Sequence, residues 1–76
     1  MASGKSRSPL NIRFGKRLGA LRKEKKWTFV YLSEHSGLDE SFLVRLEQGQ
    51  QEPCLNTQDI LAKSFGLTMS ELLKGV

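Results

Sequence analysis

The 76-residue sequence has little of several features that mark particular classes of protein. Its single cysteine, Cys54, cannot form a disulfide within the chain, which favours a reducing, cytoplasmic setting. No apolar stretch approaches the ~18 residues needed to cross a bilayer. The N-terminal MASGKSRSP also lacks the apolar segment of a signal peptide. We therefore expect a cytoplasmic protein without membrane association.

The residue combinations that catalysis or metal binding requires are missing as well. The sequence shows no paired carboxylates, no nucleophile–base set, no glycine-rich phosphate loop and no cysteine cluster. The lone His35 is distant in sequence from the only thiol, whereas a metal site needs several converging ligands. We predict that the protein is not an enzyme and that it uses neither a metal nor a cofactor.

Acidic residues are scarce at the beginning of the chain. Residues 1–26 contain nine basic residues and one acid, Glu24, for a net charge of +8. Residues 27–76 contain three basic and seven acidic residues, for a net charge of −4. A strongly basic first third suits a polyanionic partner, although a solvated helix face would carry the same charges.

The chain is long enough for one small domain. Residues 1–10 are predicted to form a disordered basic tail, which is either an arm that touches phosphate or a terminus without function. Residues 11–76 then form the domain. Its first helix is expected over about 11–25, where Phe14, Leu18 and Leu21 recur at helical spacing.

The middle of the chain has the pattern of two short helices joined by a sharp turn. We place them at about 28–35 and 40–48, with Thr28 and Asp39 as N-caps. Gly37 lies between them and can adopt the positive φ that a sharp turn needs. This pattern is a helix-turn-helix, which presents one helix to an outside surface, commonly the major groove of DNA.

Two further helices complete an all-α, compact five-helix fold. The fourth is expected over about 55–65, after Pro53 has stopped the preceding segment, with Ile60, Leu61 and Phe65 inside. The fifth is short, and Thr68 and Glu71 form the capping box at its start.

Short motifs stand in a set order along about residues 12–73: Phe14-Gly15, Leu18, Leu21-Arg22, Trp27-Thr28, Leu32-Ser33, Gly37-Leu38, Leu43, Leu46-Glu47, Gly49, Pro53, Leu55, Ala62-Lys63, Phe65-Gly66-Leu67 and Glu71-Leu72-Leu73. This ordered set resembles the Xre/Cro/C1-type helix-turn-helix family, which includes phage repressors, antitoxins and restriction–modification controller proteins. The resemblance implies a repressor-like DNA-binding domain whose third helix is the recognition helix.

The resemblance also implies roles for individual side chains. Base contacts would come from the outward residues of the third helix, Glu40, Ser41, Val44 and Arg45. Contacts with the DNA backbone would come from Arg13, Arg17, Thr28, Phe29, Gln48, Gln50 and Gln51. A homodimer interface would be formed by Leu67, Met69, Leu72, Leu73 and Val76.

Some positions depart from the family pattern and leave alternatives open. Phe29 replaces a usual Gln and cannot donate to a phosphate. Glu40 is suited to accepting from cytosine N4, or it stabilises its helix through the dipole. Val44 would meet a thymine methyl or form an apolar patch with Phe29. Arg45 would bind guanine, or it would pair with Glu47.

These observations predict a sequence-specific transcriptional regulator that binds double-stranded DNA as a repressor-like homodimer on a near-palindromic operator. The alternative is a helix-turn-helix fold that serves protein–protein interaction, as in an antitoxin-like partner. The acidic third helix and the apolar Phe29 and Val44 suit that alternative.

Overall fold

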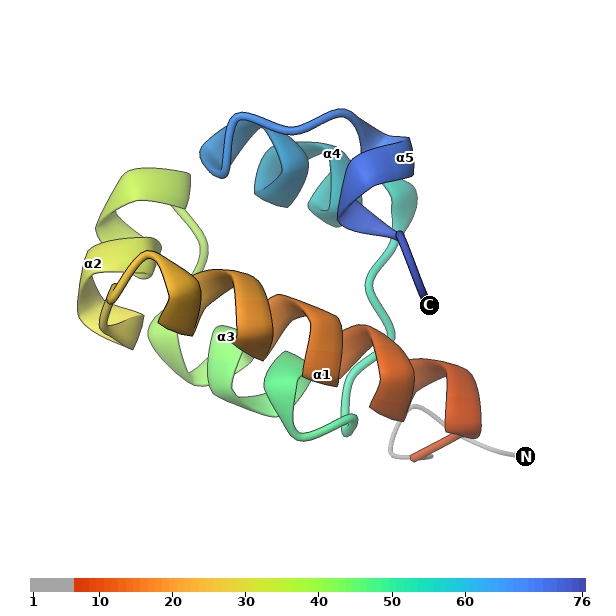
Figure 1. Cartoon of the computed structure of the whole chain (residues 1–76). Coiled ribbons are helices and arrows are strands. Elements are labelled where there is room, and N and C mark those ends of the chain that lie inside the picture. The colour runs from red at the N-terminus through yellow and green to blue at the C-terminus, as the bar shows by residue number, and fades with distance from the viewer. Residues whose placement is uncertain (1–6) are drawn as a thin grey trace.

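The computed structural model describes residues 7–76, which form five α-helices and no strand. The helices are α1 (Pro9–Glu24), α2 (Phe29–Ser36), α3 (Glu40–Glu47), α4 (Leu55–Ser64) and α5 (Met69–Leu72). In Figure 1, α1 runs across the molecule between α3 on one side and α4 with α5 on the other. The all-α, five-helix prediction is confirmed.

The first helix begins earlier than the sequence indicated. Ser8 is its N-cap, with Oγ accepting a hydrogen bond from the amide of Asn11 at 3.0 Å. Pro9 occupies the first helical position, where its missing N–H leaves no bond unmade and its φ already suits a helix. The predicted tail over 1–10 is therefore wrong at its end, because Pro9 and Leu10 are helical. Residues 1–6 of that tail lie outside the described residues.

The core contains leucines from every helix. The side chains that are fully buried are Leu18, Leu32, Leu43, Leu46, Leu61 and Leu72. Phe14 and Phe65 are also buried, while Trp27 packs against the core from its edge and stacks on Phe65 at a centroid distance of 5.2 Å. Ile60, predicted to be inside, is only half-buried.

The two helices of the helix-turn-helix lie within one residue of their expected bounds. Thr28 caps α2 by accepting from the amide of Tyr31 at 3.0 Å, and Asp39 caps α3 by accepting from the amide of Ser41 at 3.1 Å. Gly37 ends α2 with a φ of 81°, in the left-handed region that a side chain disfavours. The Ser33 hydroxyl donates to the carbonyl of Leu38 at 2.6 Å and closes the turn. These local bonds set the direction of α3.

Helix α3 lies very close to α1 because α1 presents glycines to it. A Cβ on Gly15 would lie 2.5 Å from the carbonyl oxygen of Glu47 and 2.6 Å from that of Leu46. A Cβ on Gly19 would lie 3.1 Å from Oε1 of Glu47. The close approach places the end of α3 directly on the middle of α1.

Replacing Gly15 and Gly19 by alanine should change the stability of the protein by different amounts. Gly15→Ala should lower the free energy of unfolding by about 1–3 kcal/mol, because the new Cβ would meet main-chain atoms that can move only with the helix. Gly19→Ala should have a smaller effect, because its neighbour is a side-chain tip and alanine raises helix propensity by about 1 kcal/mol. Urea denaturation followed by circular dichroism measures both. Equal losses of stability would contradict this account of the packing.

Candidate nucleic-acid interface

The four expected base-contacting residues lie together on the outer side of α3. Glu40, Ser41 and Arg45 are exposed, and Val44 is half-buried. With Asp39 they line a shallow, open depression. The opposite side of the same helix is buried through Leu43 and Leu46, so the core fixes which residues face outward. The result is a rigid helix with one free polar side.

Two hydrogen bonds organise the beginning of this surface. The Ser41 hydroxyl donates to Oδ2 of Asp39, the same oxygen that accepts from the Ser41 amide. These contacts stabilise the ionised carboxylate, and the hydroxyl of Ser41 is the main reason that the pKa of Asp39 lies below its usual value. Ser41 therefore retains only its lone pairs for an outside partner. Glu40, one residue into the helix, is well placed to stabilise the positive end of the dipole.

Arg45 does not pair with Glu47, which had been one interpretation of its role. Its Nε donates instead to Oε1 of Gln51 at 3.3 Å, so two of the expected interface residues are linked. Gln50 is attached to the same position, since its amide donates to the carbonyl of Arg45 at 2.9 Å. The exposed Gln48 is the C-cap of α3. The segment after α3 thus continues the outer surface of the helix.

Glu47 binds Arg22 of α1, an ion pair that the sequence did not reveal. Arg22 Nε lies 2.6 Å from Oε2, and Nη2 lies 3.2 Å from Oε1. Arg22 Nη1 also donates to the carbonyl of Trp27 at 2.8 Å. Both charged side chains are 12% exposed. Arg22 and Glu47 both belong to the motifs that carry the family resemblance, but that membership does not predict that the two side chains contact each other.

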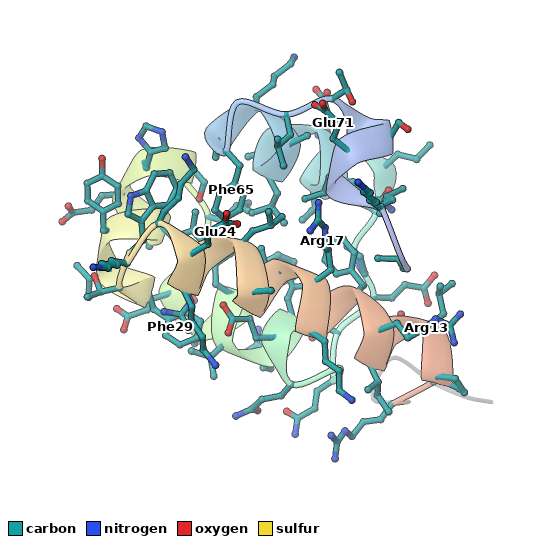
Figure 2. The ribbon with its side chains drawn as sticks, viewed as in Figure 1. Arg13, Arg17, Glu24, Phe29, Phe65 and Glu71 are labelled. Atoms are coloured by element: carbon teal, nitrogen blue, oxygen red, sulfur yellow. The ribbon has the colours of Figure 1, made fainter. Side chains whose placement is uncertain are left out.

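Phe29, at the start of α2, contacts the Arg22 side chain of this ion pair. The guanidinium carbon of Arg22 lies 4.0 Å from the ring centroid of Phe29, a cation–π geometry. Figure 2 shows Phe29 on the α3 side of α1. The half-buried ring covers Arg22 and has no donor for a phosphate. Thr28 remains exposed beside it, with Oγ1 serving as the helix cap.

Arg13 and Arg17 were expected to reach phosphates, but the structure directs them elsewhere. Arg17 donates from Nε to the carbonyl of Leu72 at 3.0 Å and from Nη2 to that of Glu71 at 2.6 Å. Arg13 donates to the carbonyl of Val76 at 3.3 Å. Figure 2 shows Arg17 on the side of α1 that faces α5. Arg17 is thus held at the carbonyls that end α5, and its contact with a phosphate stays a prediction.

The expected dimer interface also needs a correction. Leu72 is fully buried and belongs to the core, so it cannot meet a second copy. Leu67, Met69, Leu73 and Val76 are half-buried and pack against the core. The most exposed large apolar side chains are Leu55, 74% exposed, and Leu10, 56% exposed. Leu10 lines a groove together with Asn11, Phe14, Glu52, Pro53, Gln58 and Leu73, and Leu55 follows two residues after Pro53.

The other titratable candidates form no site. His35 stacks on Tyr31 with ring centroids 5.6 Å apart and contacts Trp27 edge-on. The exposed Cys54 lies 3.4 Å from Oγ1 of Thr57, and this hydrogen bond is the main cause that lowers the pKa of its thiol. Within residues 7–76, no three potential ligands gather as a metal site would require. No described helix is long and apolar enough to span a membrane.

The chain is similar to several regulators of known sequence or structure. It is 36% identical to the immunity repressor protein of Bacillus phage phi105 over 59 residues, which are 78% of this chain and 41% of that protein. It is 37% identical to the HTH-type transcriptional regulator AnsR of Bacillus subtilis over 57 residues, or 75% of this chain and 49% of AnsR. The chain thus spans less than half the length of these curated relatives. No family model matches it.

A solved relative has almost the same extent as this chain. The restriction-modification controller protein C.AhdI from Aeromonas hydrophila is 34% identical, with a TM-score of 0.78 over 82% of this chain and 94% of the controller. The clp gene regulator ClgR from C. glutamicum shares the fold with a TM-score of 0.80 at 24% identity. These relatives are regulators and not enzymes, which confirms that prediction. The chain belongs to the Xre/Cro/C1-type family of helix-turn-helix transcriptional regulators.

Proposed function

We propose that this protein binds double-stranded DNA through the outer side of α3 and regulates transcription. The observation that carries the proposal is the exposed outer side of a helix whose inner side is buried through Leu43 and Leu46. The ion pair between Arg22 and Glu47 holds this helix against α1, so its outer residues keep their positions when they meet a partner. A preorganised helix of this size fits the major groove, which is about 12 Å wide.

Arg45 is the strongest candidate for a base contact. Its guanidinium is exposed, and a bond to Gln51 orients it at the end of α3. Arginine is the residue that most commonly binds guanine O6 and N7. Ser41 can accept through its remaining lone pairs, Val44 can meet a thymine methyl, and Glu40 can accept from cytosine N4. Phosphate contacts are assigned to Thr28, Gln48, Gln50 and Gln51, which surround this side.

Arg45→Ala tests this assignment. On a duplex selected from a random pool, we expect the loss of a bidentate guanine contact to weaken binding by about 1–3 kcal/mol and to relax specificity at one position. Mobility shift on the selected and random duplexes measures both effects. Lys63→Ala, which removes a cation from the exposed side of α4, is the control and should leave both unchanged. Unchanged affinity in Arg45→Ala would remove Arg45 from the interface.

The competing function is a protein–protein interaction module that uses the same surface. The acidic Glu40 and the half-buried Val44 in the depression on α3 favour it. The two functions differ in their response to salt, because binding to phosphates releases counterions and weakens as salt rises. Absence of binding to any duplex at low salt would favour the protein partner and contradict our proposal.

We further propose that the protein acts as a homodimer. A short recognition helix contacts few base pairs, and two copies related by a twofold axis would contact half-sites about one helical turn apart. The exposed apolar side chains Leu10 and Leu55, the groove that includes Leu73, and the half-buried Val76 offer a surface for the second copy. Leu72 takes no part, since it is buried.

Leu55→Glu tests the dimer. Leu55 begins α4, where an acid suits the helix dipole, so the fold should tolerate the change. Two like charges brought together across a twofold axis should shift the protein toward monomer in sedimentation equilibrium. Val30→Glu, which also replaces an exposed apolar residue in a first helical turn, is the matched control. Equal association of both variants and the unaltered protein would place the interface elsewhere.

A further inference from the structure

Two exposed lysines of α1 have no role in the contacts described above. The side-chain amines of Lys16 and Lys23 form neither a hydrogen bond nor a salt bridge with any other residue in the described range 7–76. The arginines of α1, in contrast, are all engaged by carbonyls or by Glu47. The lysines are therefore the cations of α1 whose side chains have no partner within residues 7–76, and their position on the helix decides what they can reach.

Both lysines lie on the part of α1 that adjoins α3. Gly15 and Gly19 contact the end of α3 directly. Since an α-helix turns about 100° per residue, Lys16 and Lys23 lie roughly 100° and 80° around the helix from Gly15. The buried Phe14 and Leu18 lie in the opposite rotational direction from Gly15, toward the core. The two lysines thus occupy the solvent-facing border of the contact between α1 and α3.

The register along this border follows from the backbone contacts. Ile12 lies beside Gly49, since a Cβ on that glycine would come within 2.9 Å of Ile12 Cγ1. Gly15 lies beside Leu46, so α1 and α3 run in opposite directions, as Figure 1 also shows. Lys16 is therefore nearer the end of α3, and Lys23 is nearer its beginning.

A third cation lies at the same border. Arg7 Nε donates to the carbonyl of Gln48 at 3.1 Å, which places its guanidinium at the C-terminal end of α3. Arg7 is exposed, so its remaining N–H groups are accessible to a partner. Positive charge is consequently available along the whole length of α3, on the side where α1 accompanies it.

We propose that Arg7, Lys16 and Lys23 form a phosphate-binding edge that extends the DNA interface from α3 onto α1. This inference rests on the proposed function. An α-helix with its side chains is about 10–12 Å wide and fills the major groove, so a helix packed beside it lies over the phosphates that border the groove. Flexible lysines bind such phosphates as point charges without regard to sequence. The edge supplies affinity, and α3 supplies specificity.

The double variant Lys16→Gln/Lys23→Gln tests the edge on the full chain. Each phosphate contact contributes about −0.9 to the slope of log affinity against log salt, so the slope should become shallower by about 1.8. Between 50 and 200 mM salt, the change in Kd should shrink by about twelvefold relative to the unaltered protein. Selected and random duplexes should lose affinity by the same factor, because phosphates are common to both. Fluorescence anisotropy measures these Kd values.

The control is Lys63→Gln/Lys74→Gln, which removes the same charge from α4 and from the residues after α5, on the other side of α1 from α3. A shallower slope of log affinity against log salt in the α1 variant, with an unchanged slope in the control, supports the phosphate-binding edge. Equal slopes in both variants, with steep salt dependence in the unaltered protein, would overturn the edge and leave DNA binding standing. If the unaltered protein binds no duplex, the proposed function fails together with the edge. Melting by circular dichroism should be the same for all three proteins.

Discussion

The contact between α1 and α3 determines the rest of this structure. It has a steric part, in which Gly15 allows the carbonyls at the end of α3 to approach the backbone of α1. It also has an electrostatic part, in which Arg22 binds both oxygens of Glu47 and the carbonyl of Trp27. Because each buried charge is left unpaired when its partner is removed, the two side chains depend on each other. Together these contacts set the position of α3 along α1 and the rotation of α3 about its own axis.

A consequence of this contact is that the arginines of α1 have structural functions. Arg22 joins α1 to α3 and to the beginning of α2, where Phe29 covers it. Arg17 joins α1 to the end of α5 by binding the carbonyls of Glu71 and Leu72. The helix therefore connects both halves of the domain, and among its cations only the lysines have side chains without a partner in the described residues. In a chain that buries as little surface as this one, such polar connections between helices matter more than in a larger protein.

The departures from the family pattern gain a physical explanation from this arrangement. Phe29 removes a possible phosphate donor, yet its ring adds a cation–π contact to the ion pair that positions α3. Glu40 places an acid in the first turn of α3, where the helix dipole favours it. Both residues contribute to the rigidity of the helix that is proposed to enter the groove. Because Phe29 offers no donor for a phosphate, the proposed DNA interface depends more on positive charge elsewhere, such as the lysines of α1.

The sequence by itself determined the helices, the turn and most of the core. Capping residues such as Thr28, Asp39 and Thr68, the positive φ of Gly37, and the spacing of the leucines act within a few residues of each other, so their effects are visible locally. Only the tertiary structure decided which cation meets which partner. Arg13, Arg17 and Arg22 are alike in sequence, but the rotation of about 100° per residue separates their roles. Arg13 and Arg17 lie on one face of α1 and bind carbonyls at the C-terminal end of the chain, whereas Arg22 lies on another face and binds Glu47 of α3. Leu72 could be assigned to the core only after α5 had been placed against α4, because a periodic apolar pattern does not distinguish a buried face from an interface.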